Sequence, residues 1–180
     1  MSTTITGPEA EGVHWDLSTL VSDAETARAR IETALQQTRA FEERYRGTVA
    51  DLDGPSLAAA LAELAIIDNE LSRLSSYAHL RESTAVTDEE NRDLVAVTDQ
   101  KMIEAMNALR FFELEWIALD EPTARSLYDA PEVAGDRHYL VSARRYAPHT
   151  LSEPEERMLA ERGPAAVSAW QTLFGQVTST

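Results

Sequence analysis

Four histidines are the side chains of this chain most able to hold a metal ion: His14, His79, His138 and His149. None lies in an H-E-x-x-H motif, and no two are four residues apart on one helix, the spacing of a helical zinc site. His138 and His149 lie on opposite sides of a helix that should end at Pro148. The pattern favours surface or capping histidines, and it predicts no metal-binding residue.

Other patterns that carry catalysis or bind a cofactor are missing or incomplete. The seven glycines form neither G-x-x-x-x-G-K-[ST] nor G-x-G-x-x-G, and no serine lies in G-x-S-x-G. Glu113 and Glu115 are two positions apart on an expected helix, so they point in different directions and are interpreted as solvated. Arg144 and Arg145 are a single basic pair, which does not make a phosphate site. We predict no catalytic and no cofactor-binding residue, and we expect this chain alone to be inactive.

The composition narrows the class of protein. The chain has 180 residues, 43% of them hydrophobic, which suits one globular domain burying roughly 70% of its unfolded surface. The chain has 16 basic and 31 acidic residues, which gives a net charge of −15. Nucleic acid and anionic membranes are therefore unexpected partners, since both require clustered Lys and Arg. The acidity is interpreted as a means of solubility.

Three further features suggest a cytoplasmic location. The chain contains no cysteine, which fits a reducing compartment. Residues 1–12 are polar and lack the basic start and apolar core of a signal peptide. The longest apolar-rich run, from Leu57 to Ile67, contains Glu63 and is too short to span a bilayer.

The elements that would position any site are helices, and two long ones form the centre. Residues 57–78 repeat apolar side chains every three or four positions, the spacing of one helical face: Leu57, Leu61, Leu64, Ile67, Leu71, Leu74 and Ala78. Residues 95–119 carry a stripe with alternating steps of three and four: Val95, Thr98, Met102, Ala105, Leu109, Phe112, Trp116 and Leu119. The short segment 82–87 between them forces the two helices antiparallel.

The flanking segments predict further helices. The Ser22-x-x-Glu25 capping box opens a helix that reaches Tyr45 and stops at Gly47, with one apolar face: Ile31, Leu35, Thr38, Phe41 and Tyr45. Before it, we expect Trp15, Leu17 and Leu20 to anchor a short segment on the body. Two more capping boxes begin at Thr87 and Ser152.

The C-terminal third should form shorter helices. A short helix is expected within 123–128, and another within 137–146 with Tyr139, Leu140 and Ala143 on its apolar side. The last helix should bury four side chains: Val167, Trp170, Leu173 and Phe174. We therefore predict an all-α fold: an antiparallel helical bundle built on a long central helical hairpin, with shorter C-terminal helices. It should comprise a flexible tail at 1–12 and a single helical domain at 13–180.

The aromatic residues Phe111, Phe112 and Trp116 allow two interpretations. They could form a patch on which a ligand stacks. The apolar stripe instead favours Phe112 and Trp116 in the core, with Phe111 packed on a neighbouring helix.

Five segments, in this order, resemble the N-terminal region of oligoendopeptidase F-type zinc peptidases, relatives of thimet oligopeptidase. They cover nearly the whole chain: W-D-L-S at 15–18, F-x-x-x-Y-x-G at 41–47, L-x-x-L-x-x-Y-A at 71–78, L-S-x-x-E-E-x-x-L-A at 151–160 and A-W-x-x-L-F at 169–174. All five are helix-packing motifs, so the resemblance concerns architecture rather than chemistry.

The resemblance implies a role in a larger peptidase. In that family the zinc ligands and the general base lie downstream of the matched region, so none is carried onto a residue here. The N-terminal helices line one wall of a cleft that admits short peptides, and they pack against the catalytic domain. The chain is thus expected to be such a region, lacking zinc itself. Two alternatives stay open: a stand-alone helical binding protein, and a module that assembles with a separately encoded catalytic chain.

Overall fold

The computed structural model describes residues 15–85 and 88–178, and every regular element in that part of the chain is helical. The seven α-helices follow in this order: α1 (Ala24–Tyr45), α2 (Gly54–Thr84), α3 (Glu89–Ala118), α4 (Glu121–Tyr128), α5 (Arg137–Arg144), α6 (Glu153–Gly163) and α7 (Ala169–Thr178). Short 3-10 turns lie at Val49–Asp51, Pro131–Val133 and Ala147–His149, and a π-helical turn at Pro164–Ser168 joins α6 to α7. The all-α prediction is confirmed.

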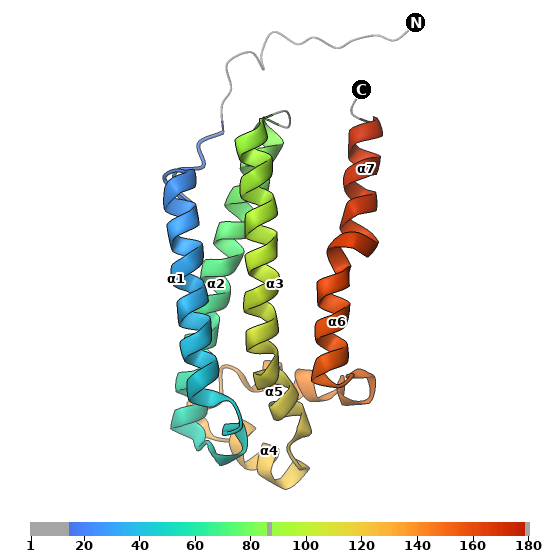
Figure 1. Ribbon diagram of the computed structural model, residues 1–180. Coiled ribbons are helices and arrows are strands. Elements are labelled where there is room, and N and C mark those ends of the chain that lie inside the picture. Colours follow the sequence, from blue (N-terminus) through green and yellow to red (C-terminus); the bar gives the residue numbers. More distant parts are fainter. Residues whose placement is uncertain (1–14, 86–87, 179–180) are drawn as a thin grey trace, which may run out of the picture.

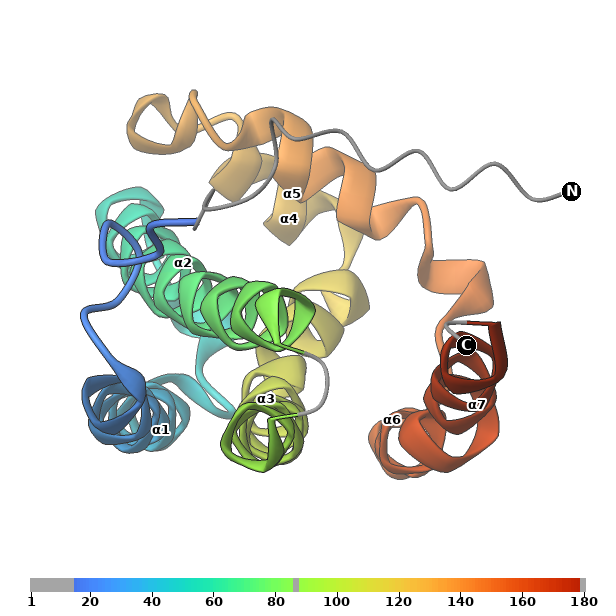
Figure 2. The same cartoon turned by 90° about the horizontal axis from the view of Figure 1, so that it is seen from above.

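The long helices α1, α2 and α3 run antiparallel to their chain neighbours and form a three-helix body (Figure 1). Helices α4 and α5 close one end of this body. From there the chain turns back, and α6 and α7 rise beside α3 (Figure 1). Seen from above, α1, α2 and α3 form a triangle, while α6 and α7 stand outside it (Figure 2). We call residues 153–178 the arm.

The predicted hairpin is confirmed, with α2 of 31 residues and α3 of 30 residues. Every residue of the α2 stripe is buried except Leu64, which is half-buried. The α3 stripe also faces the core, with Thr98, Ala105, Phe112 and Trp116 buried and the other four side chains half-buried. The α1 face is buried throughout. One apolar cluster fills the end of the body that α4 and α5 close, and a second lies around Ile31, Leu74 and Leu94.

The helix ends follow the local chemistry, with shifts from the predicted caps. Asp23 rather than Ser22 caps α1, because its Oδ1 accepts the Thr26 N–H at 2.7 Å. A carboxylate competes well for this position, since it also faces the positive end of the helix dipole. Asp88 caps α3, whereas the proposed Thr87 lies outside the described residues. Before α6, Glu155 accepts the Ser152 N–H at 2.9 Å, as the third capping box predicts.

Gly47 ends the first helix as expected. Its φ of +78° lies in the left-handed region, which glycine adopts without a steric penalty. Thr48 then donates its N–H to the Tyr45 carbonyl at 3.0 Å, and the chain turns towards α2.

Two predicted core contacts are wrong. Trp15 is 75% exposed, because the apolar packing of this segment begins only at Leu17 and continues through Leu20 and Val21. On α5, Leu140 and Ala143 are buried, but Tyr139 is exposed. The predicted tail at residues 1–12 lies outside the described residues.

Candidate functional site

The histidines are on separate elements. His79 on α2 faces Asp99 on α3, with Nε2 3.1 Å from the carboxylate, and both side chains are exposed. His138 lies in the first turn of α5, His149 ends a 3-10 turn, and His14 is outside the described residues. Within residues 15–85 and 88–178, no group of three His, Asp or Glu side chains could hold a metal ion.

The carboxylate Glu115 has a structural role that the sequence did not reveal. Its Oε1 accepts the Gly47 N–H at 2.8 Å, and its Oε2 lies 3.5 Å from the Val49 N. It therefore binds the loop that follows α1, whereas Glu113 is exposed. The prediction that both carboxylates are solvated is wrong for Glu115. No local signal could have shown this contact, because its partners are more than sixty positions away in the chain.

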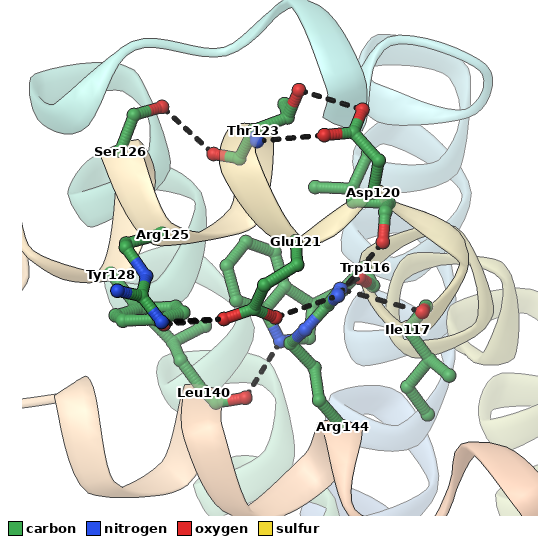
Figure 3. A network of polar contacts seen from close by, with 11 residues as sticks. Trp116, Ile117, Asp120, Glu121, Thr123, Arg125, Ser126, Tyr128, Leu140 and Arg144 are labelled. Atoms are coloured by element: carbon green, nitrogen blue, oxygen red, sulfur yellow. Dashed lines mark hydrogen bonds and ion pairs between the residues drawn. The ribbon is translucent and has the colours of Figure 1, made fainter.

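Arg144 donates hydrogen bonds to backbone carbonyls at the end of α3 (Figure 3). Its guanidinium donates to the carbonyls of Trp116 at 2.9 Å and Leu119 at 2.8 Å. The Trp116 carbonyl otherwise accepts only the long C-cap contact from the Leu119 N–H at 3.4 Å, because α3 ends there. Trp116 in turn donates its indole N–H to the Leu140 carbonyl at 2.9 Å. Arg144, but not its exposed neighbour Arg145, thus forms a part-buried clasp between α3 and α5, and its guanidinium is already engaged by the protein.

Glu121 completes this clasp from the first turn of α4. The Tyr128 hydroxyl donates to its Oε1 at 2.8 Å, and Arg144 lies 3.4 Å from its Oε2 (Figure 3). The hydrogen bond from Tyr128 lowers the pKa of the Glu121 carboxyl, and Arg125 and Arg144 lower it further. These polar groups bond to one another within the protein, so the network stabilises the junction of α3, α4 and α5.

The aromatic residues are core residues, as predicted. Phe41, Phe111 and Phe112 pack together with ring centroids 5.5 to 6.2 Å apart, and Tyr45 joins them from α1. The Arg46 guanidinium lies 4.6 Å from the centroid of the Phe111 ring. The ligand-stacking interpretation has no support, since Phe111 and Phe112 are both buried.

A shallow apolar pocket of about 370 Å³ lies where the arm leaves the body. Its lining comes from the end of α3 and the segment before α6, and includes Phe111, Leu114, Ile117, Ala118 and Leu151. Two ion pairs hold the arm beside it: Arg46 with Glu153 at 3.1 Å, and Arg110 with Glu156 at 3.2 Å.

Beyond this base the arm exposes its apolar side chains. The prediction that Val167, Trp170, Leu173 and Phe174 are buried is wrong, since all four are exposed, Trp170 to 68% and Phe174 to 70%. The reason is tertiary. α6 lies against α3, but past the π-helical turn α7 stands away from the body (Figures 1 and 2). We call these four residues the arm stripe.

The part of the chain that the structure describes contains no helix both long and apolar enough to cross a membrane. The features that remain as candidates for function are therefore surfaces: the pocket at the base of the arm and the arm stripe. Both are largely apolar, which suits contact with another polypeptide segment.

Comparisons with known proteins support the resemblance inferred from the motifs. A family model described as Oligopeptidase F matches residues 115–180, which include the end of α3 and the whole arm. The oligoendopeptidase F homolog of Borreliella burgdorferi is 24% identical over 169 residues, covering 94% of this chain. No solved structure gives a significant match.

These matches cover most of this chain but only part of the relative. The chain spans only 28% of the length of the Borreliella relative, so the similarity concerns a part of that protein. The family model matches the region where the two candidate surfaces lie. The chain is thus similar to part of an oligoendopeptidase F homolog, and its last third matches the Oligopeptidase F family model.

Proposed function

We propose that this chain is the N-terminal helical region of an oligoendopeptidase F-like metallopeptidase, where it forms one wall of a cleft for short peptides. One observation carries the proposal: the similarity runs along 94% of the chain but covers only 28% of the relative. The structure is compatible with such a role, because the body is a helical scaffold whose three long helices bury their own apolar faces.

The chemistry would come from outside this chain. The parent reaction would be peptide-bond hydrolysis, in which a zinc ion activates a water molecule. The described residues do not fit zinc, since they bring no three ligating side chains together. The contribution of this chain would be to shape the cleft and restrict entry to oligopeptides, in a cytoplasmic enzyme.

The surface proposed to meet the peptidase portion is the pocket at the base of the arm. Its lining is mainly apolar, and Leu114, Ile117 and Leu151 can bury a side chain from a facing element. The ion pairs of Glu153 and Glu156 fix the two walls of the pocket relative to each other. A preformed recess of this kind suits a permanent contact with a covalently attached domain.

The alternative is a stand-alone helical protein that binds a partner and has no activity. It is favoured by the closed core of the body, in which α1, α2 and α3 bury their own stripes without outside help. A separately encoded catalytic chain would satisfy the same observation.

The test is to read the coding DNA beyond codon 180 and assay the product. An in-phase frame that encodes H-E-x-x-H, with zinc-dependent cleavage of short peptides by the longer protein, would support the first proposal. A stop codon directly after Thr180 would reject it. Purifying the natural protein from its own cells would then separate the remaining two, because a peptidase subunit would copurify in one case only.

A further inference from the structure

Helix α6 meets the body through a polar face. Four of its residues are half-buried and fall on one side of the helix, at steps of three, four and three: Glu153, Glu156, Ala160 and Gly163. No α6 residue is buried, and its large apolar side chains Met158 and Leu159 are exposed. The arm therefore meets α3 with two carboxylates and two small residues, and without a large apolar side chain.

The back of α3 receives this face. Four α3 side chains lie opposite its core stripe, at steps of four, three and four: Ile103, Asn107, Arg110 and Leu114. They are half-buried because α6 packs on this side, so that α3 lies between α1 and α6 (Figure 2). Two polar atoms here, Asn107 Oδ1 and Arg110 Nε, are buried without a hydrogen-bond partner among the described residues. Water would satisfy both if α6 moved away, so the docked position of the arm carries a desolvation cost.

Two ion pairs oppose this cost. Arg46, which follows the last turn of α1, lies 3.1 Å from both carboxylate oxygens of Glu153, and Arg110 lies 3.2 Å from Glu156. The four side chains are only 23 to 34% exposed, so salt screens these pairs less than it screens surface pairs. Charge rather than apolar burial is thus the main attraction between α6 and the body.

The segment that joins α5 to α6 can act as a pivot. Residues 145–149 are all exposed, and so are Leu151 and Ser152, while Thr150 is half-buried. A region with few buried apolar contacts opens at a lower free energy than the core does. The connection and the helix that follows it both have this character.

We propose that the arm is a hinged element, which two ion pairs hold on the back of α3 and which pivots at residues 145–152 when the pairs break. We call the Arg46–Glu153 and Arg110–Glu156 pairs the latch. Release of the arm removes one wall of the pocket at its base, because Leu151 and Glu153 form that wall. The latch therefore decides whether the pocket exists. This inference goes beyond the proposed function and does not depend on it, because every contact involved lies within the chain.

Distances between spin labels test the proposal. The chain has no cysteine, so two introduced thiols carry the labels at chosen positions. Ala65→Cys/Gln171→Cys reports the distance from the body to the arm, and Gln36→Cys/Ala65→Cys reports a distance within the body; all three positions are exposed. Double electron–electron resonance should give one narrow distance distribution for each pair.

Reversing the charge of the latch should release the arm. Glu153→Arg/Glu156→Arg turns two attractions into repulsions, so the ratio of released to latched molecules should rise at least about tenfold. The body-to-arm distances should then become longer and broader, while the distance within the body stays the same. Adding Arg110→Glu restores one pair and should lower the ratio again at least about threefold.

The matched control for this reversal is Glu113→Arg/Glu161→Arg. It makes the same change in net charge at exposed positions of α3 and α6, and it should leave the distances unchanged. Circular dichroism shows whether each variant is folded.

Hydrogen exchange provides a second measurement that leaves the sequence of α6 untouched. Arg46→Met/Arg110→Met removes the latch from the side of the body. The α6 amides should then exchange at least about threefold faster, because a released helix of 11 residues frays in water. The amides in the buried middle of α2 should exchange at the rate of the parent protein.

Three outcomes would overturn the proposal. A broad body-to-arm distribution in the parent would mean that the arm is not held on α3. A narrow distribution in the Glu153→Arg/Glu156→Arg variant, or unchanged α6 exchange in Arg46→Met/Arg110→Met, would mean that other contacts hold the arm. Equal release in the Glu113→Arg/Glu161→Arg control would attribute the effect to net charge instead of the latch.

Discussion

The three-helix body and the arm use the same kind of sequence pattern with opposite results. Both carry aromatic and aliphatic side chains at helical spacing. In the body, Trp116 is 1% exposed, donates its indole N–H to the Leu140 carbonyl and lies against the Arg144 guanidinium. In the arm, Trp170 is 68% exposed. The comparison teaches that periodicity identifies the face of a helix that is suited to burial, whereas the partner that buries it must be found in space.

Replacing each tryptophan by alanine gives the sharpest contrast between the two regions. Trp116→Ala removes a buried ring and leaves a cavity, which should lower the free energy of unfolding by about 3–5 kcal/mol. Trp170→Ala removes an exposed ring and should change it by less than ~0.5 kcal/mol. Urea unfolding followed by circular dichroism measures both.

Glu113→Ala serves as the control on the same helix as Trp116, because its side chain is exposed. It should also cost less than ~0.5 kcal/mol. Equal midpoints for Trp116→Ala and Trp170→Ala would show that the body and the arm do not differ in the way described.

The clasp at the end of α3 should give the next largest effect. Arg144→Met keeps the apolar stem but removes the guanidinium donor from the Leu119 carbonyl and leaves the Trp116 carbonyl only the 3.4 Å contact from the Leu119 N–H, which should cost about 1–3 kcal/mol. Arg145→Met changes the exposed neighbour and should be close to neutral. The same urea measurement compares them. An unchanged free energy of unfolding for Arg144→Met would mean that water replaces the guanidinium at no cost.

The glycine that ends α1 should give a smaller effect. Gly47→Ala places a Cβ in the left-handed region, at a cost of about 1–2 kcal/mol, even though nothing lies within 4 Å of the new atom. Gly135 also has open space around it but no positive φ, so Gly135→Ala should be nearly neutral. Thermal unfolding of the two variants separates backbone strain from steric contact. A lower melting temperature for Gly135→Ala than for Gly47→Ala would contradict this account.

The smallest effect concerns pH and the pairing of α1 with α2. Arg30 donates to both oxygens of Glu70, at 2.6 and 2.7 Å, and this lowers the pKa of the Glu70 carboxyl. Because the folded pKa is the lower one, the pair stabilises the fold above the unfolded pKa of about 4.3, and this contribution is lost as the pH falls through the folded value. The half-buried pair should contribute about 0.2–1 kcal/mol.

Glu70→Gln tests this by urea unfolding at several pH values between 7 and 3. The variant should be less stable than the parent at neutral pH, and the difference should shrink as the pH falls. Adding Arg30→Gln to it should cost only the further hydrogen bond from Arg30 to the Leu20 carbonyl at 3.3 Å, since the ion pair is already broken. A difference that grows towards low pH would reverse the sign and reject the assignment.

Much of the scaffold could be predicted from the residue pattern alone. The stripes on α1, α2 and α3 are local properties of the chain, and each is wide enough to require burial, so the central hairpin followed from their spacing. Gly47 could be assigned as a helix stop because the left-handed backbone conformation that ends the helix is a local property of glycine. The motifs at 151–160 and 169–174 pointed to the same peptidase relatives that the sequence comparisons found.

The remaining features depended on contacts between distant parts of the chain. Glu115 looked like a solvated carboxylate until the fold placed it beside the Gly47 N–H, and Arg144 looked like half of a surface pair until α5 met the end of α3. The arm stripe has the pattern of a core face, but α7 departs from α3 at the π-helical turn, and no described element covers it. A sequence determines which side chains must avoid water or find a partner, because these are properties of the residues. Only the tertiary structure decides whether that partner is within the chain, because burial depends on which surfaces the fold brings together.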